Sequence, residues 1–170
     1  MSSFSEETLE KKLIDLNVSQ QSIQQLSLWL IHHRKHFQKI VAVWNRELHK
    51  ASNNRKLTFL YLANDVVQNS RKKAPEFAKE FGAIMKKVLG HLSKLRLDEK
   101  TVKSITRLIQ IWQERQIFNP EVQKELNKVW SIKEPKEPQE EPGTPPGTPP
   151  LPKKPRRGNT NCLSIVIVFS

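Results

Sequence analysis

Hydrophobic residues recur every three or four positions along most of this chain, which is the spacing of one buried face of an α-helix. Seven segments follow this pattern, at residues 5–16, 17–33, 34–51, 55–73, 74–95, 98–118 and 120–132. No segment alternates apolar and polar residues between turns as a β-strand does. The pattern therefore predicts an all-α fold of about seven consecutive helices joined by short breaks.

Several of these segments begin with residues that favour the start of a helix. The first starts with a serine followed by two glutamates, and Pro75 suits the first turn of the fifth. For the second helix, Asn17 has capping-box spacing with Gln20, and Ser19 is an alternative cap. The pair Asn119 and Pro120 marks the last break.

The composition changes abruptly after Ile132, and this change predicts two regions. Residues 1–132 hold nearly all the large apolar side chains, so they form one helical domain, and residues 133–170 form a Pro-rich tail. A segment this poor in apolar residues cannot offset the entropy of ordering, so we expect a disordered tail. The tail contains a basic cluster, LPKKPRR, of the kind found in nuclear localisation signals. The meaning of the apolar end, Cys162–Ser170, is open; it is much shorter than the ~20 residues of a membrane span.

The charge of the chain points to an anionic partner. The net charge is +12, and residues 1–132 alone carry 23 Lys and Arg against 13 Asp and Glu. A basic folded domain suits nucleic acid, a phosphorylated peptide or an acidic membrane. A single cysteine, Cys162, allows no intrachain disulfide and fits the cytosol or nucleus.

The motifs of common enzymes and cofactor sites are absent from the sequence. There is no glycine-rich phosphate loop and no GxSxG elbow. His32 and His36 lie one helical turn apart, but Arg34 and Lys35 between them would oppose a metal cation. We therefore expect no enzyme activity, no cofactor and no metal site.

A polar stripe runs along the otherwise apolar fourth segment. At 100° per residue, one helix face gathers an aromatic ring, a carboxylate and three amides: Tyr61, Asn64, Asp65, Gln68 and Asn69. A solvated face of this protein would carry Lys or Glu, whereas amides and one Asp suit directional hydrogen bonds. Two interpretations stay open from these residues alone. The stripe either bonds a neighbouring helix or lines a groove for a ligand.

The sixth segment carries a pair of arginines. Leu108, Ile109 and Trp112 are expected to point inward, following Ile105. The opposite side is expected to hold Arg107, Gln110, Ile111 and Glu114, with Arg115 at its margin. Arg107 and Arg115 lie about two turns apart on one side, and guanidinium groups suit phosphate geometry.

Four stretches carry a resemblance to a known family: LSLWLIHHRKH, NRKLTFLYLANDVVQNSRKK, PEF and IWQERQIF. Together they resemble the CTD-interacting domain (CID) of the type 1 regulation of nuclear pre-mRNA domain-containing proteins, over about residues 1–130. The resemblance implies a right-handed superhelix of eight helices, an ENTH/VHS-like fold.

The resemblance also implies a function. Family members bind the phosphorylated heptad-repeat tail of the largest RNA polymerase II subunit, and act in transcription, termination and pre-mRNA 3′-end processing in the nucleus. It implies that Asp65 accepts a hydrogen bond from the peptide tyrosine. The remaining implied contacts are Tyr61, Asn64 and Asn69 for the peptide turn and backbone, Arg107 and Arg115 for phosphoserine at the second position, and Ser19 and Gln20 at the groove entrance.

The resemblance suggests further partners, and other functions compete with it. A phosphatase acting on the polymerase tail and 3′-end processing factors are candidate partners. No sustained heptads follow Ile132, so we expect a monomer without the coiled coil of type 1 proteins. One alternative is a trafficking domain that binds phosphoinositides or cargo through the same superhelical fold, although the acidic start of the first helix disfavours membrane binding. The other is RNA binding, for which the sequence shows no aromatic platform.

Overall fold

The computed structural model describes residues 3–131, and every regular element in that range is helical. The elements are α1 (Glu6–Asp15), α2 (Gln20–His32), the 3-10 turn η1 (Arg34–His36), α3 (Phe37–Lys50), α4 (Asn53–Ser70), α5 (Glu76–Ser93), α6 (Glu99–Glu114) and α7 (Pro120–Trp130). The predicted all-α class and seven helices are confirmed for this range. The turn η1 is a separate element that the apolar pattern merged into the third helix. The Pro-rich tail and its basic cluster lie outside the described residues.

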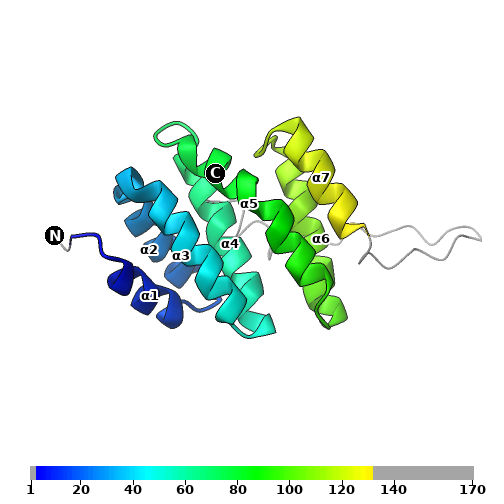
Figure 1. The fold of residues 1–170 in the computed structure, drawn as a ribbon, viewed down its shortest axis with the longest axis horizontal. Helices are drawn as coiled ribbons and strands as arrows, with labels where there is room; N and C mark the ends of the chain where they lie inside the picture. Colours follow the sequence, from blue (N-terminus) through cyan, green and yellow to red (C-terminus); the bar gives the residue numbers. More distant parts are fainter. Residues whose placement is uncertain (1–2, 132–170) are drawn as a thin grey trace, which may run out of the picture.

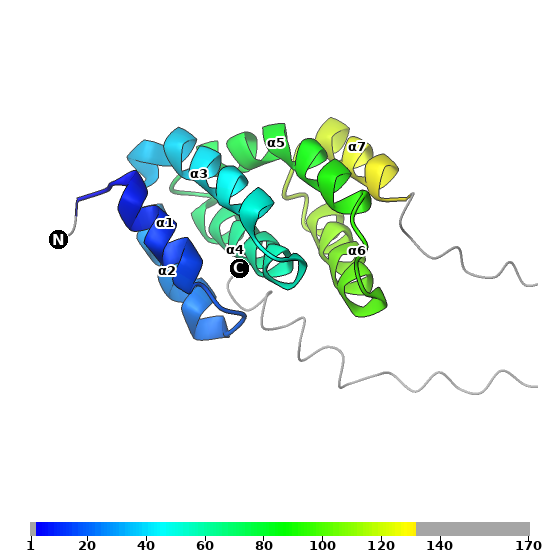
Figure 2. The same ribbon diagram turned by 60° about the horizontal axis from the view of Figure 1, so that its bottom comes forward.

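The helices pack in two staggered layers. Most of them contact the helix two places further along the chain, so that α3, α5 and α7 lie on one side, and α2, α4 and α6 on the other (Figure 2). Helix α1 packs on α3 at one end, and α7 packs on α5 and α6 at the other (Figure 1). Helix α4 therefore lies in the middle of its layer, between α2 and α6.

The helix starts follow the signals in the sequence. Ser5 caps α1 by accepting from the Thr8 amide at 3.1 Å. Of the two candidate caps for α2, Ser19 forms the cap and accepts from the Ser22 amide at 3.2 Å. Asn17 instead accepts from the Ser19 amide at 2.9 Å, so the capping box of Asn17 and Gln20 does not form. Capping satisfies amides that lack intrahelical partners.

Large aromatic side chains fill the core between the layers. Trp44 of α3 packs edge-on against Phe81 of α5, with ring centroids 5.1 Å apart. Its indole donates to the Phe59 carbonyl of α4 at 3.0 Å, so the only polar atom of this side chain is satisfied. Trp112 of α6 meets Phe118 edge-on at 5.1 Å. Such pairs add about 0.5–1.5 kcal/mol beyond the area they bury.

Two adjacent basic residues at the start of α4 bind the carboxyl ends of two other helices. Arg55 donates to the carbonyls of Leu13, Ile14 and Leu16 at 2.7–2.9 Å, at the end of α1. Lys56, which is buried, donates to the carbonyls of Leu48, His49 and Ala51 at 2.7–3.1 Å, at the end of α3. Carbonyls at helix ends lack intrahelical donors and carry the negative end of the helix dipole. This pair of cations therefore ties α1 and α3 to α4.

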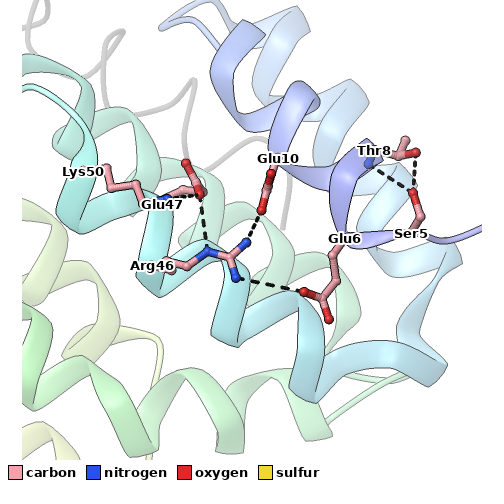
Figure 3. Close-up of polar contacts among 7 residues, drawn as sticks. All are labelled: Ser5, Glu6, Thr8, Glu10, Arg46, Glu47 and Lys50. Atoms are coloured by element: carbon pink, nitrogen blue, oxygen red, sulfur yellow. Dashed lines mark hydrogen bonds and ion pairs between the residues drawn. The ribbon is translucent and has the colours of Figure 1, made fainter.

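An exposed ion network also joins α1 to α3. Arg46 of α3 reaches Glu10 and lies 4.0 Å from Glu6, both on α1 (Figure 3). It also lies 3.4 Å from Glu47, which pairs with Lys50 at 3.3 Å. Apart from Glu47, whose side chain is 11% exposed, these side chains are well exposed to solvent, so each pair contributes about 1 kcal/mol or less.

Candidate functional site

The polar stripe of α4 lies between α2 and α6, and most of it is buried. Asn64 is 1% exposed, Asp65 2% and Gln68 6%. Tyr61 is half-buried and packs against the core, whereas Asn69 is exposed. The stripe thus passes from the interior to the surface along one helix face.

Two amides of the stripe form a hydrogen-bond network with α6. The Trp112 indole donates to Asn64 Oδ1 at 2.9 Å, and Gln68 Nε2 donates to the same oxygen at 2.7 Å. Arg115 donates to Gln68 Oε1 at 2.8 Å. Asn64 and Gln68 therefore follow the first of the two interpretations, bonding to a neighbouring helix. Direct contact of Asn64 with a peptide stays a prediction.

Asp65 is the unusual member of the stripe. Burial raises the pKa of its carboxyl to about 6, because the charged form loses hydration. The nearby polar groups of Ser27 on α2 and of Asn69 favour the charged form and lower the pKa, but burial outweighs them. Its Oδ1 atom is buried and has no hydrogen-bond partner among residues 3–131. A buried acceptor without a donor is costly unless a ligand supplies one.

The two arginines of α6 lie in different electrostatic settings. Arg107 lies 3.3 Å from Glu114 Oε1 on its own helix, so a carboxylate already neutralises part of its charge. Arg115 is half-buried, and its hydrogen-bond partner is the amide oxygen of Gln68. This oxygen has no formal charge, so it does not neutralise the guanidinium. Arg115 forms no ion pair within residues 3–131. Arg115 therefore keeps its full charge next to the stripe.

The predicted groove entrance lies at the start of α2. Ser19 and Gln20 are both exposed. Gln20 precedes Ser27 by seven residues, about two helical turns, and so lies on the same face of α2. Ser27 itself was missed by sequence reasoning, because one small residue in an apolar helix gives no signal of its own. Asp65 of α4 thus lies near Ser27 of α2, and Gln68 of α4 binds Arg115 at the end of α6.

One residue of α6 was placed wrongly. Ile111 was expected on the outward side with Arg107, but it is 1% exposed. Ile111 precedes Arg115 by four residues and shares its flank. That flank faces α4, as the bond from Arg115 to Gln68 shows, so it is covered.

A cavity of the described domain lies away from the predicted site residues. A cavity of about 650 Å³ opens between the end of α6 and the start of α7, lined by Trp112, Phe118, Gln123 and their neighbours, and includes none of the predicted site residues. Among residues 3–131 no three potential metal ligands come together. None of the described helices is long and apolar enough to cross a membrane. The predicted site residues on α2, α4 and α6 therefore lie outside this cavity.

Comparison with known proteins identifies the fold. The family model of the CID domain matches residues 7–126, which is most of the chain. The chain belongs to the CID domain family. CID domains have roles in RNA processing that involve the C-terminal domain (CTD) of RNA polymerase II. A solved structure described as a non-canonical CID of Ctk3 aligns with 75% of this chain and 93% of that chain, with a TM-score of 0.65 at 14% identity. At this identity the likeness concerns the fold alone.

Two human relatives carry the same domain. Regulation of nuclear pre-mRNA domain-containing protein 1B is 59% identical over 121 residues, which is 71% of this chain and 37% of the relative. Regulation of nuclear pre-mRNA domain-containing protein 1A is 56% identical over 126 residues, which is 74% of this chain and 40% of the relative. The CID chain described here thus spans about two fifths of these proteins. Their names associate them with nuclear pre-mRNA.

Proposed function

We propose that this CID domain binds the heptad-repeat tail of the largest RNA polymerase II subunit when its second-position serine is phosphorylated. The observation that carries the proposal is the buried Asp65 carboxylate, which has one oxygen without a donor. One turn further along α4, Gln68 binds Arg115, whose charge no ion pair neutralises within residues 3–131. Binding, without catalysis, is the proposed activity.

Asp65 is suited to receive the tyrosine hydroxyl of a repeat. With a pKa of about 6, the carboxyl is mostly ionised at neutral pH. A hydroxyl donating to a carboxylate forms a bond roughly twice as strong as a neutral one. Such a donor would also satisfy Oδ1 and remove the penalty of burying it unpaired.

Arg115 and Arg107 are suited to receive the phosphate. A guanidinium pairs with two phosphate oxygens at once, which is the usual way in which phosphorylated peptides are recognised. Arg115 keeps its full charge, whereas Arg107 must share its charge with Glu114 at 3.3 Å. Arg115 should therefore provide the larger part of the phosphate affinity. The basic charge of the domain would accelerate encounters with a polyanionic tail.

The cellular role follows from the ligand. By binding the phosphorylated tail in the nucleus, the domain would act as a scaffold or regulator of transcription, termination and pre-mRNA 3′-end processing. A phosphatase of the polymerase tail and 3′-end processing factors are the proposed further partners. A single repeat should bind weakly, because a flexible peptide loses entropy on the surface.

Fluorescence anisotropy with the full 170-residue chain tests the proposal. Two-repeat peptides, unmodified and phosphorylated at the second-position serine, are compared across the wild type, Asp65→Asn, Arg107→Met and Arg115→Met. The control Lys128→Met removes one exposed positive charge from α7.

We expect phosphorylation to tighten binding in the wild type and in the control. Arg115→Met should remove most of the gain and Arg107→Met a smaller part, whereas Asp65→Asn should weaken both peptides. If the affinity changes neither with phosphorylation nor with any of the three substitutions, the proposal is refuted. Steep salt dependence without phosphate dependence would indicate RNA binding, and capture by phosphoinositide vesicles would indicate a trafficking domain.

A further inference from the structure

A chain of hydrogen bonds leads from the interior of the domain to Arg115. It starts at the Trp112 indole, which is 1% exposed and donates to Asn64 Oδ1 at 2.9 Å. Gln68 donates to the same oxygen at 2.7 Å. The carbonyl oxygen of Gln68 then accepts from Arg115 at 2.8 Å. Exposure rises along the chain of bonds, from 1% at Trp112 and Asn64 to 6% at Gln68 and to the half-buried Arg115.

From this geometry we propose that Gln68 is a positioning residue that holds the Arg115 guanidinium ready for the phosphate. This inference rests on the proposed function and deepens it, because Gln68 need not touch the peptide. Its amide is oriented by Asn64, since Nε2 donates inward and leaves the acceptor Oε1 facing Arg115.

The chemistry of Gln68 suits this role better than that of a carboxylate. A glutamate at this position would neutralise Arg115 and compete with the phosphate for it. A neutral oxygen fixes the guanidinium and leaves its charge for the ligand. Arg107 lacks this advantage, because the Glu114 carboxylate lies 3.3 Å from its guanidinium and neutralises part of its charge.

Preorganisation gives the magnitude of the effect. Immobilising one flexible side chain on binding weakens affinity by about threefold to tenfold. Gln68 removes this penalty in advance for Arg115. Its loss should therefore reduce the gain in affinity from phosphorylation by a similar factor, and leave the unmodified peptide almost unaffected.

The test replaces Gln68 by Met, which has a similar length and no comparable donor or acceptor. Gln38→Met serves as the matched control, because Gln38 is an exposed glutamine on α3. Affinities for the unmodified and phosphorylated two-repeat peptides are measured for wild type, Gln68→Met, Arg115→Met and the double variant.

We expect Gln68→Met to lower the phosphate gain about threefold to tenfold, with no further loss in the Arg115→Met background. Additive losses in the double variant, or an equal weakening of both peptides, would show that Gln68 does not act through Arg115 and would overturn the inference. A wild type without any phosphate gain would instead refute the proposed function.

A second measurement needs no peptide. The 15N relaxation of the Arg115 Nε–H group reports the order of the guanidinium on the ps–ns timescale. We expect this order to fall in Gln68→Met and to stay unchanged in Gln38→Met. An unchanged Arg115 side chain in folded Gln68→Met would overturn the inference, whatever the peptide affinities.

Discussion

Replacing Asp65 by Asn should stabilise the free domain at neutral pH. The pKa of this carboxyl is about 6 in the folded chain, against an ordinary value of 3.8, and burial is the main cause of the difference. A raised pKa means that the folded state binds the proton more tightly than the unfolded state does. The ionised carboxylate above pH 6 therefore lowers the stability of the fold, and this penalty disappears below about pH 4.

The difference between the two pKa values corresponds to roughly 3 kcal/mol at neutral pH. The asparagine removes this penalty but changes the polar surroundings shared with Ser27 and Asn69. We therefore expect Asp65→Asn to raise the free energy of unfolding by about 1–3 kcal/mol at pH 7.5. For a domain of this size, that is a rise in Tm of roughly 3–12 °C.

Urea denaturation followed by circular dichroism between pH 4 and pH 8 measures this effect. The stability difference between Asp65→Asn and the wild type should grow as pH rises through the interval from about 4 to 6, and should be small at pH 4. Asp15→Asn is the control, because Asp15 is exposed at the end of α1. If Asp65→Asn is destabilised at every pH, the carboxylate is well solvated or fully bonded in the free domain and the reasoning is wrong.

Three further predictions concern individual bonds. Lys56→Met should lower the free energy of unfolding by about 2–4 kcal/mol in chemical denaturation, because it removes the buried ammonium group that donates to three carbonyls at the end of α3. Arg46→Gln should lower it by about 1 kcal/mol or less, and raising the salt concentration should shrink that difference. Asn64→Leu should shift the indole N–H resonance of Trp112 and destabilise the domain by about 1–3 kcal/mol, because it removes the buried acceptor; an unmoved resonance would contradict the bond.

The sequence alone predicted where the helices lie, but it did not show how deeply the residues of the polar stripe are buried. Helix starts depend on nearby residues such as Ser5 and Ser19, and apolar spacing depends on a single helix, so both can be predicted locally. The burial of Asn64 depends on Trp112, which is 48 residues away in the sequence. No local pattern in the sequence contains that contact. The sequence therefore could not show whether the polar stripe bonds a neighbouring helix or lines a groove for a ligand.

The error at Ile111 has a related cause. The prediction from a helical wheel assumed that only one side of α6 is buried, but α4 covers one flank of α6 and α7 covers another. The flank that carries Arg115 and Ile111 is therefore both polar and buried. The same geometry explains why Gln68 was included in the stripe without a role, because its partner Arg115 lies on another helix.

The adjacent cations at the start of α4 have a consequence for which substitutions the domain can tolerate. Arg55 and Lys56 bind main-chain oxygens of α1 and α3, and every amino acid supplies such an oxygen. Surface residues near those helix ends can therefore change without removing an acceptor. The two donor side chains cannot be replaced so easily. Arg55 donates to three carbonyls through one guanidinium nitrogen, and Lys56 is buried. In a mutational scan of the whole domain, intolerance should concentrate on these two neighbouring side chains and be weak at the exposed positions beside the carbonyls they bind.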